Sequence, residues 1–299
     1  MLSPQLRTRI NYISLMEARI LRTLGALGAE IGGVDLSQPL KKKAVESILA
    51  AWHAHLVVVF RDQNMSDEAL VAFSRNFGTL EKAPIPEKLR GGLAHMRQLP
   101  EVAVVSNVIE NGVAIGALGD GELAWHNDMT YLPNPPPASV LCAVELPPSG
   151  GDTWFCNMYL AYETLPAALR TRIQGLKANH DSSYTSAGTL RKGFDEVNDV
   201  SKAPGAKHPL VLTHPDTGRK ALYLGRRRNG YIVGLPLDES AALLDELWAH
   251  ATKPEFAISH RWRLGDVVMW DNRCTMHRRD AFDPAARRIL HRTQLLNAQ

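Results

Sequence analysis

The sequence predicts a mainly β fold, a jelly-roll-type sandwich with helices at its periphery. Short runs rich in β-branched and aromatic residues recur along the chain, and turn signals rich in glycine, proline and aspartate separate them. Only a few segments have the spacing of an amphipathic helix. The length of 299 residues suits one large all-β domain.

The first half of the chain combines two helices with several strands. Residues 43–55 carry apolar side chains at helical spacing. Ser66 is placed to cap a second helix, with Asp67 and Glu68 in its first turn. We expect strands at 21–36, 56–60, 102–105, 123–132, 139–145 and 153–157, and irregular structure at 81–101.

The second half predicts helices at about 160–174 and at 238–251, the latter burying Leu243, Leu244, Leu247 and Trp248. A hairpin is expected from 210 to 224, and the last strands at 256–262, 267–271 and 288–295. Two segments are candidates for mobile loops that cover a binding site. The glycine-rich run 111–121 suits either a lid or a plain surface loop, and the polar run 181–207 suits an excursion over the mouth of a site.

Composition limits the class of protein. Hydrophobic residues make up 45% of the chain and charged residues 22%, and the net charge is +3, without the basic footprint of a nucleic-acid-binding protein. The three cysteines are too few and too widely spaced for a disulfide framework or a zinc finger. No stretch approaches the roughly 18 apolar residues that span a membrane. We expect a cytoplasmic protein whose partner is a small molecule, not nucleic acid or a membrane. Its oligomeric state, a homo-oligomer included, is left open.

The N-terminal segment lacks the apolar core of a signal peptide because charged residues, Arg7 and Arg9 among them, interrupt it. A regular pattern begins at Met16 and continues into the folded region. We therefore expect residues 1–15 to be a loose extension and residues 16–299 to form a single domain.

The triplet His126-Asn127-Asp128 is the strongest functional signal. On a strand, side chains at i and i+2 point to the same face, so both ends of the triplet could reach one metal ion. His277 is a candidate third ligand, and two histidines with one carboxylate form the ligand set of non-haem Fe(II) oxygenases. The alternative is a buried histidine beside a turn carboxylate, since a chain with 11 histidines easily contains such a triplet by chance.

A second His-x-Asp triplet, His214 to Asp216, continues into Thr217-Gly218. The sequence Pro-Asp-x-Gly is typical of a turn, so we interpret this copy as a hairpin turn and not as a ligand pair.

The last expected strand places Arg288, Leu290, Arg292 and Gln294 on one face. If this face points inward, Arg288 could bind a carboxylate near the metal through its planar guanidinium. Thr153 could add a hydroxyl hydrogen bond. The alternatives are a solvent-facing strand with arginines for solubility, and an ordinary β-branched strand residue.

Three runs carry a further signal: LAWHNDMTY at 123–131, PPSGGDTWFCNM at 147–158 and HRWRLGDVVMWDNRCTMHR at 260–278. Together they resemble the taurine/2,4-dichlorophenoxyacetate dioxygenase (TauD/TfdA) family of Fe(II)- and 2-oxoglutarate-dependent oxygenases. The run THPDTGRKALY at 213–223 also resembles the family. The resemblance extends from about Gly25 to Gln294 and is greater for the aryloxyalkanoate members than for the taurine members.

The resemblance implies a double-stranded β-helix, that is, a cupin-like jelly roll. It implies that His126, Asp128 and His277 are the catalytic iron ligands, with Thr153 and Arg288 on the distal carboxylate of 2-oxoglutarate. Arg292 stands where family members bind the acidic group of the primary substrate. The cofactors implied are Fe(II), 2-oxoglutarate and O2.

The implied substrate is a small organic anion. An aryloxyalkanoic acid is the first expectation, cleaved to a phenol and a keto or aldehyde acid while succinate and CO2 are formed. Taurine, another alkylsulfonate or an alkyl sulfate is the alternative, although a carboxylate at Glu122 would repel a sulfonate if it pointed inward. A zinc hydrolase and a non-catalytic jelly-roll binding module are more remote alternatives. Arg226 to Arg228 suit either the pocket mouth or surface charge.

Overall fold

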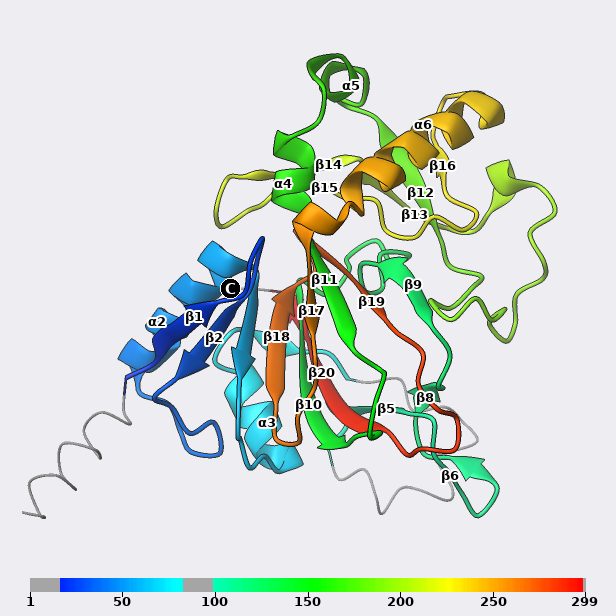
Figure 1. Cartoon of the computed structure of the whole chain (residues 1–299). Coiled ribbons are helices and arrows are strands. Elements are labelled where there is room, and N and C mark those ends of the chain that lie inside the picture. Colours follow the sequence, from blue (N-terminus) through cyan, green and yellow to red (C-terminus); the bar gives the residue numbers. More distant parts are fainter. Residues whose placement is uncertain (1–16, 83–98, 298–299) are drawn as a thin grey trace, which may run out of the picture.

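Two β-sheets pack face to face at the centre of the molecule, in a computed structural model that describes residues 17–82 and 99–297 (Figure 1). The expected extension at residues 1–15 and most of the expected irregular stretch 81–101 lie outside the described residues. The larger sheet has the order β1 (Arg19–Thr23), β2 (Ala29–Gly32), β3 (Val57–Phe60), β18 (Val267–Asp271), β10 (Ala138–Glu145), β20 (Ile289–Asn297), β5 (Ala103–Ser106), β8 (Ala117–Leu118), and β4 (Thr79–Leu80) pairs with β20. The smaller sheet has the order β17 (Ala257–His260), β11 (Thr153–Asn157), β19 (Thr275–Arg279), β9 (Leu123–His126). This arrangement confirms the mainly β jelly roll.

The centre of the larger sheet is buried on both faces, which explains why its central strands β3 and β18 are continuous apolar runs. In β18, Val268 and Trp270 belong to the core between the two sheets, whereas Val267 and Met269 belong to the core on the outer side. Side chains alternate across a strand, so each face of the sheet needs its own apolar set. The inner core positions the functional residues of both sheets.

The outer core is covered by the two helices expected in the first half. Helix α2 (Lys42–His55) buries Ile48 and Trp52. Helix α3 (Asp67–Ser74) begins after Ser66, whose side chain accepts from the backbone N–H of Ala69, as the capping pattern predicted. Figure 1 shows both helices beside the larger sheet.

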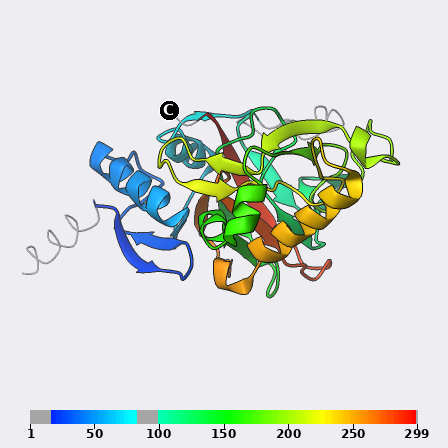
Figure 2. The same cartoon turned by 90° about the horizontal axis from the view of Figure 1, so that it is seen from above.

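A second layer lies above the jelly roll in Figure 1 and is seen from above in Figure 2. It contains the helices α4 (Met158–Glu163), α5 (Ala167–Arg172) and α6 (Leu237–Ala251), and the 3-10 turns η2 (Val200–Lys202) and η3 (Pro254–Phe256). Its strands form the sheet β13 (Gly205–Pro209), β12 (Lys177–Asp181), β16 (Tyr231–Ile232) and the predicted hairpin β14 (Val211–Thr213) with β15 (Lys220–Leu222). Helix α6 buries Leu243, Leu244 and Leu247 as expected, but Trp248 only in part.

Two expectations about secondary structure were wrong. The strand expected at 123–132 ends at His126, because Met129 has a positive φ of 50° and the chain turns there. No strand was expected between 271 and 288, but Thr275–Arg279 forms the strand β19, which carries His277. The glycine-rich run, left open between a lid and a plain loop, contains β8 and the end of a small hairpin, β6 (Ile109–Glu110) with β7 (Val113–Ala114). The run 181–207 includes the end of β12 and the start of β13.

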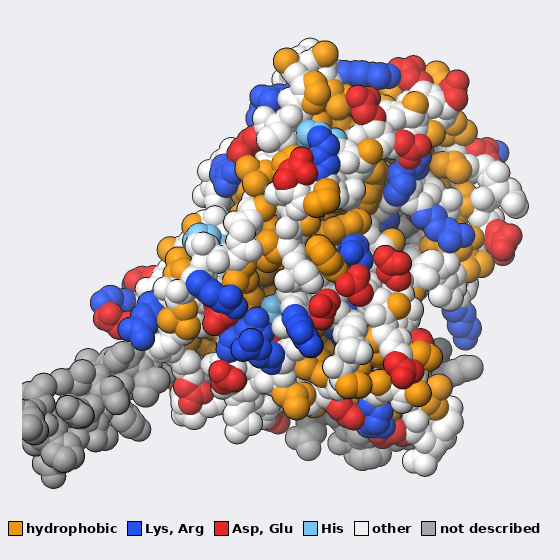
Figure 3. Space-filling view, in the orientation of Figure 1, with side chains coloured by type: hydrophobic (Ala, Val, Ile, Leu, Met, Phe, Trp, Pro, Cys, Tyr) orange, Lys and Arg blue, Asp and Glu red, His pale blue; other side chains and the backbone are white. Residues whose placement is uncertain are grey.

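Charges of both signs are interspersed over the face of the molecule that Figure 3 shows. None of the helices in the described part of the chain combines the length and the apolar character needed to cross a bilayer.

Candidate active site

The smaller sheet brings the two predicted histidines together. His126 at the end of β9 stands directly opposite His277 in β19, and their ring centroids are 4.2 Å apart. The turn after β9 carries Asp128 back toward them, so that its Oδ1 lies 3.8 Å from Nε2 of each histidine. All three residues are buried and line one pocket. The predicted trio therefore converges, although Asp128 reaches the site from a turn and not from a strand.

The hydrogen bonds leave metal-binding atoms available. Nδ1 of His126 donates to the carbonyl oxygen of Ala124 at 2.7 Å, which fixes the tautomer and leaves Nε2 as a lone-pair donor. The Oδ1 atom of Asp128 faces both histidines, whereas its Oδ2 accepts from the hydroxyl of Ser139 at 2.7 Å. Two imidazole nitrogens and one carboxylate oxygen, all within 4.8 Å of one another, fit a divalent first-row metal ion.

The protonation states also fit a metal ion. Burial lowers the pKa of His126 well below its usual value and lowers that of His277 as well, so both imidazoles are neutral. Burial alone would raise the pKa of Asp128, but its interactions with His277 and with the guanidinium of Arg292, together with the hydrogen bond from Ser139, hold it well below its usual range. Neutral imidazole and ionised carboxylate are the forms that coordinate metals.

Arg288 and Thr153 lie at one end of the same pocket. Arg288 is only 2% exposed, and burial lowers its pKa to about 9. Its Nη2 donates to the carbonyl oxygen of Gly151 at 3.2 Å, while its Nε has no partner among the described residues. The hydroxyl of Thr153 accepts from the indole N–H of Trp262 at 3.0 Å, so its own proton remains free to donate into the pocket. A carboxylate is the group that would satisfy both residues.

Gly151 makes room for this arrangement. Its φ is +70°, and a Cβ atom there would lie 3.0 Å from Nε of Arg288. A side chain at this position would therefore be strained and would press on the guanidinium.

Arg292 lies beside the carboxylate of the candidate metal site. Its Nη1 is 3.6 Å from Oδ1 of Asp128, and both residues line the pocket together with Glu81. Arg288, Arg292 and Gln294 all face this pocket, so the predicted inward face of β20 is observed. The opposite face of β20 contacts α3, where Thr293 bonds to Ser74.

Several residues of the pocket were not singled out by the sequence. Ser139 bonds to Asp128, and Arg279 faces the pocket two residues after His277. The spacing of two residues could have found Arg279 if 275–279 had been recognised as a strand. Arg191 also lines the pocket.

Two questions that the sequence left open have an answer in the structure. The side chain of Glu122 is 66% exposed and pairs with Arg278, so it does not point inward. Among the three consecutive arginines, Arg226 lines the pocket, whereas Arg227 pairs with Asp245 at 2.7 Å outside it.

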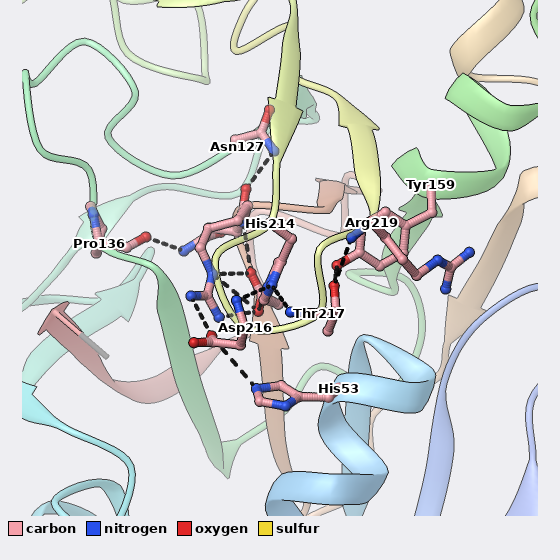
Figure 4. Close-up of polar contacts among 11 residues, drawn as sticks. His53, Asn127, Pro136, Tyr159, His214, Asp216, Thr217 and Arg219 are labelled. Carbon is pink, nitrogen blue, oxygen red and sulfur yellow. Dashed lines mark hydrogen bonds and ion pairs between the residues drawn. The ribbon is translucent and has the colours of Figure 1, made fainter. Parts of the chain in front are cut away.

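The second His-x-Asp triplet stabilises the hairpin β14–β15, as the turn pattern predicted (Figure 4). Nδ1 of His214 accepts the backbone N–H groups of Asp216 and Thr217, each at 3.2 Å, so its Nε2 donates to Asp271 at 2.9 Å. The carboxylate of Asp216 pairs instead with Arg273 at 2.8 Å.

Cys274 lies close to His214 and Asp271, and the spacing of the three side chains would suit a second metal site. Both oxygens of Asp271, however, accept hydrogen bonds from the guanidinium of Arg273. Burial raises the pKa of the Cys274 thiol well above its usual value. This cluster is a buried ion-pair network whose groups are satisfied without a metal.

The fold and the site define a mononuclear non-haem metal oxygenase built on a jelly roll. The chain belongs to the family described as taurine catabolism dioxygenase TauD, TfdA family, whose model matches residues 20–294. It is an enzyme, a 2-oxoglutarate-dependent dioxygenase that uses Fe(II), 2-oxoglutarate and O2. This confirms the predicted family and cofactors, and it excludes the two remote alternatives, a zinc hydrolase and a non-catalytic binding module.

Three relatives show the breadth of the family. The chain is 37% identical to the alpha-ketoglutarate-dependent 2,4-dichlorophenoxyacetate dioxygenase of Cupriavidus pinatubonensis, over 94% of this chain and 97% of that protein. It is 35% identical to the alpha-ketoglutarate-dependent sulfate ester dioxygenase of Pseudomonas putida, over 87% and 84%. The crystal structure of AAD-2 in complex with Mn(II) and N-oxalylglycine superposes with a TM-score of 0.76 at 32% identity, over 95% of this chain and 99% of that chain.

Proposed function

We propose that the enzyme hydroxylates an aryloxyalkanoic acid on the carbon that bears the ether oxygen. One atom of O2 enters succinate, formed from 2-oxoglutarate with loss of CO2, and the other enters the substrate as a hydroxyl. The product is a hemiacetal or hemiketal, which collapses to a phenol and an aldehyde or keto acid. The observation that carries the proposal is the convergence of His126, Asp128 and His277 with Arg288 in one pocket of a chain similar to a 2,4-dichlorophenoxyacetate dioxygenase.

His126, Asp128 and His277 are the residues that would hold Fe(II), and iron with 2-oxoglutarate would supply the activation of O2. The protein's own contribution is to keep Asp128 ionised and both imidazoles neutral, and to fix their orientation through the Nδ1 bond of His126 and the Oδ2 bond of Asp128. The buried pocket excludes water around the reacting groups.

Arg288 and Thr153 would bind the distal carboxylate of 2-oxoglutarate. The buried guanidinium supplies charge-assisted hydrogen bonds and the Thr153 hydroxyl donates one more. Arg292 would bind the acidic group of the primary substrate, because it faces the same pocket next to the metal-binding carboxylate. Positioning the substrate carbon beside the metal is the step that these arginines carry out.

The test is succinate formation from 2-oxoglutarate with Fe(II) and O2, measured with phenoxyacetate, both phenoxypropionate enantiomers, taurine and an alkyl sulfate. Strong stimulation by an aryloxy acid, with release of the phenol, is the expected result. Single alanine variants of His126, Asp128 and His277 should show no turnover. Near-wild-type turnover in any of them would remove that residue from the ligand set.

The second candidate is an alkyl sulfate or sulfonate dioxygenase, which the similarity to a sulfate ester dioxygenase favours. The outward direction of Glu122 removes one objection to a sulfur oxyanion. Release of sulfate or sulfite instead of a phenol, in the same panel, distinguishes this candidate.

A further inference from the structure

A pair of arginines on the far side of Asp128 has no role in the site described so far. The guanidinium carbon of Arg191 lies 4.0 Å from the ring centroid of Tyr131, and that of Arg226 lies 5.6 Å from the same ring. All three side chains line the pocket that contains the metal-binding trio. Arg191 and Arg226 are therefore gathered around one aromatic side chain beside the catalytic centre.

Arg226 is tied to the metal-binding segment through its neighbour Gly225. The backbone N–H of Gly225 donates to the side-chain oxygen of Asn127, and the backbone N–H of Asn127 donates to the carbonyl oxygen of Gly225, both at 3.2 Å. Asn127 stands between His126 and Asp128, so these two bonds hold the backbone next to Arg226 beside both residues.

Arg191 reaches the pocket from the polar segment between β12 and η2. Its backbone N–H donates to the carbonyl oxygen of Ser183 at 2.8 Å, and Ser186 of the same segment also lines the pocket. Two residues of this segment therefore line the pocket, and one of them, Arg191, brings a positive charge to it.

Within residues 17–82 and 99–297, no acidic side chain forms an ion pair with Arg191 or Arg226, and Asp128 and Asp181 act on Arg226 only at longer range. The Nε atoms of Arg191 and Arg226 are buried and have no hydrogen-bond partner among the described residues. Arg227, next in the chain, pairs with Asp245 at 2.7 Å, and Arg292 lies 3.6 Å from Asp128. Burial and the neighbouring charge of Arg191 lower the pKa of Arg226. Two adjacent, half-buried cations repel each other, and an anion placed between them would relieve that repulsion.

We propose that Arg191 and Arg226, stacked with Tyr131, form a second anion-binding subsite that binds a second acidic group of the substrate. This rests on the proposed function, in which Arg292 takes the first acidic group. The substrate class is then an aromatic ether with two acidic groups, one on the alkanoic side chain and one on the ring. The subsite gives the enzyme its preference for diacids over monoacids.

The experiment measures affinity by calorimetry for the anaerobic enzyme loaded with Fe(II) and 2-oxoglutarate. The probes are phenoxyacetate, with one carboxylate, and 3- and 4-carboxyphenoxyacetate, each with two. We expect the wild-type enzyme to bind at least one diacid ten or more times more tightly than phenoxyacetate, a difference of about 1.4 kcal/mol. Arg191→Gln and Arg226→Gln should lose this preference and keep their affinity for phenoxyacetate within about threefold.

Arg227→Gln is the matched control, because it removes a neighbouring arginine that pairs outside the pocket. It should retain the diacid preference. Equal wild-type affinities for monoacid and diacids, or a preference that survives in both pocket variants, would overturn the proposal. So would an equal loss of monoacid and diacid binding, which would mean that the pair holds the only acidic group.

Succinate formation with phenoxyacetate is measured in parallel. A diacid preference that is lost in the variants, without turnover of any aryloxy acid, would refute the proposed function and leave the subsite standing. Turnover of phenoxyacetate without a diacid preference would support the proposed function and refute the second subsite.

Discussion

The hydroxyl of Ser139 donates to Oδ2 of Asp128, the carboxylate oxygen that does not face the two histidines. The direction of this bond is settled by its surroundings. The hydroxyl oxygen of Ser139 also accepts N–H groups from the amides of Asn272, at 3.2 Å, and of Gln294, at 3.1 Å. With both lone pairs in use, its single proton points to Asp128. Ser139 therefore orients the carboxylate while Oδ1 remains available to a metal.

Replacing Ser139 by alanine should weaken metal binding without removing any ligand. Partners that orient a metal ligand typically contribute 10- to 100-fold to affinity, and about tenfold is expected here. Calorimetric titration with Mn(II) in the absence of O2 measures this directly. Ser74→Ala is the control, since Ser74 is also buried and bonded but contacts Thr293 on the outer face of the sheet. Equal metal affinities of Ser139→Ala and the control would show that the bond has no orienting role.

The parts of the fold that were predictable are those where burial shapes the sequence. Strands β3 and β18 lie in the middle of the larger sheet with both faces covered, so their residues are apolar runs that length and flanking turns identify. The cap at Ser66 and the turn at Asp216 are local hydrogen-bond patterns that depend on few neighbours.

The strand and the pocket residue that could not be predicted from the sequence are those whose side chains serve the pocket and not the apolar core. Strand β19 turns His277 and Arg279 toward the pocket, so it lacks the apolar alternation by which a strand is recognised. The convergence of His126, Asp128 and His277 could be predicted from motif and spacing, because the triplet is local and the resemblance supplied His277. The position of Arg191 could not, because its segment reaches the site only through the packing of the layer above the jelly roll.

Arg288→Ala should raise the concentration of 2-oxoglutarate needed for half-maximal turnover. The variant loses charge-assisted hydrogen bonds worth roughly 1.5–3 kcal/mol, or roughly ten- to a hundredfold. The measurement is KM for 2-oxoglutarate at saturating primary substrate. Arg287→Ala is the control, because this neighbouring arginine is exposed and pairs with Glu145 and Glu110. An unchanged KM for 2-oxoglutarate in Arg288→Ala would contradict the proposal that Arg288 binds the distal carboxylate of 2-oxoglutarate.

Arg292→Ala should weaken the primary substrate selectively. Arg292 faces the pocket beside Asp128, whereas Arg288 lies four residues earlier in the chain and bonds to Gly151, so the two arginines serve different ligands in the proposed function. KM for phenoxyacetate should rise about tenfold or more, from the loss of a charged hydrogen bond, while KM for 2-oxoglutarate stays within about twofold. If both constants rise equally, the two roles are not separable as proposed.

Asp271 stabilises the fold in a pH-dependent way. Burial alone would raise its pKa, but hydrogen bonds from His214 and Arg273 outweigh burial and lower it from 3.8 to about 2. A carboxyl group whose pKa is depressed in the folded state contributes stability above its unfolded pKa and loses it as the pH falls through the folded pKa. The contribution of about 2 kcal/mol should therefore be complete at pH 6 and decline between about pH 4 and pH 2.

Asp271→Asn tests this, because it removes the charge and keeps the shape of the side chain. Breaking a buried ion pair leaves Arg273 with only the partly exposed carboxylate of Asp216 as a partner, so the free energy of unfolding should fall by roughly 3 kcal/mol at pH 6. Urea titrations at pH 6 and pH 3 should show the gap between variant and wild type narrowing at the lower pH. Asp245→Asn, which removes an exposed partner of Arg227, should cost under about 1 kcal/mol at pH 6. A gap for Asp271→Asn that stays constant from pH 6 to pH 3 would mean that the buried network does not hold this carboxylate in its ionised form.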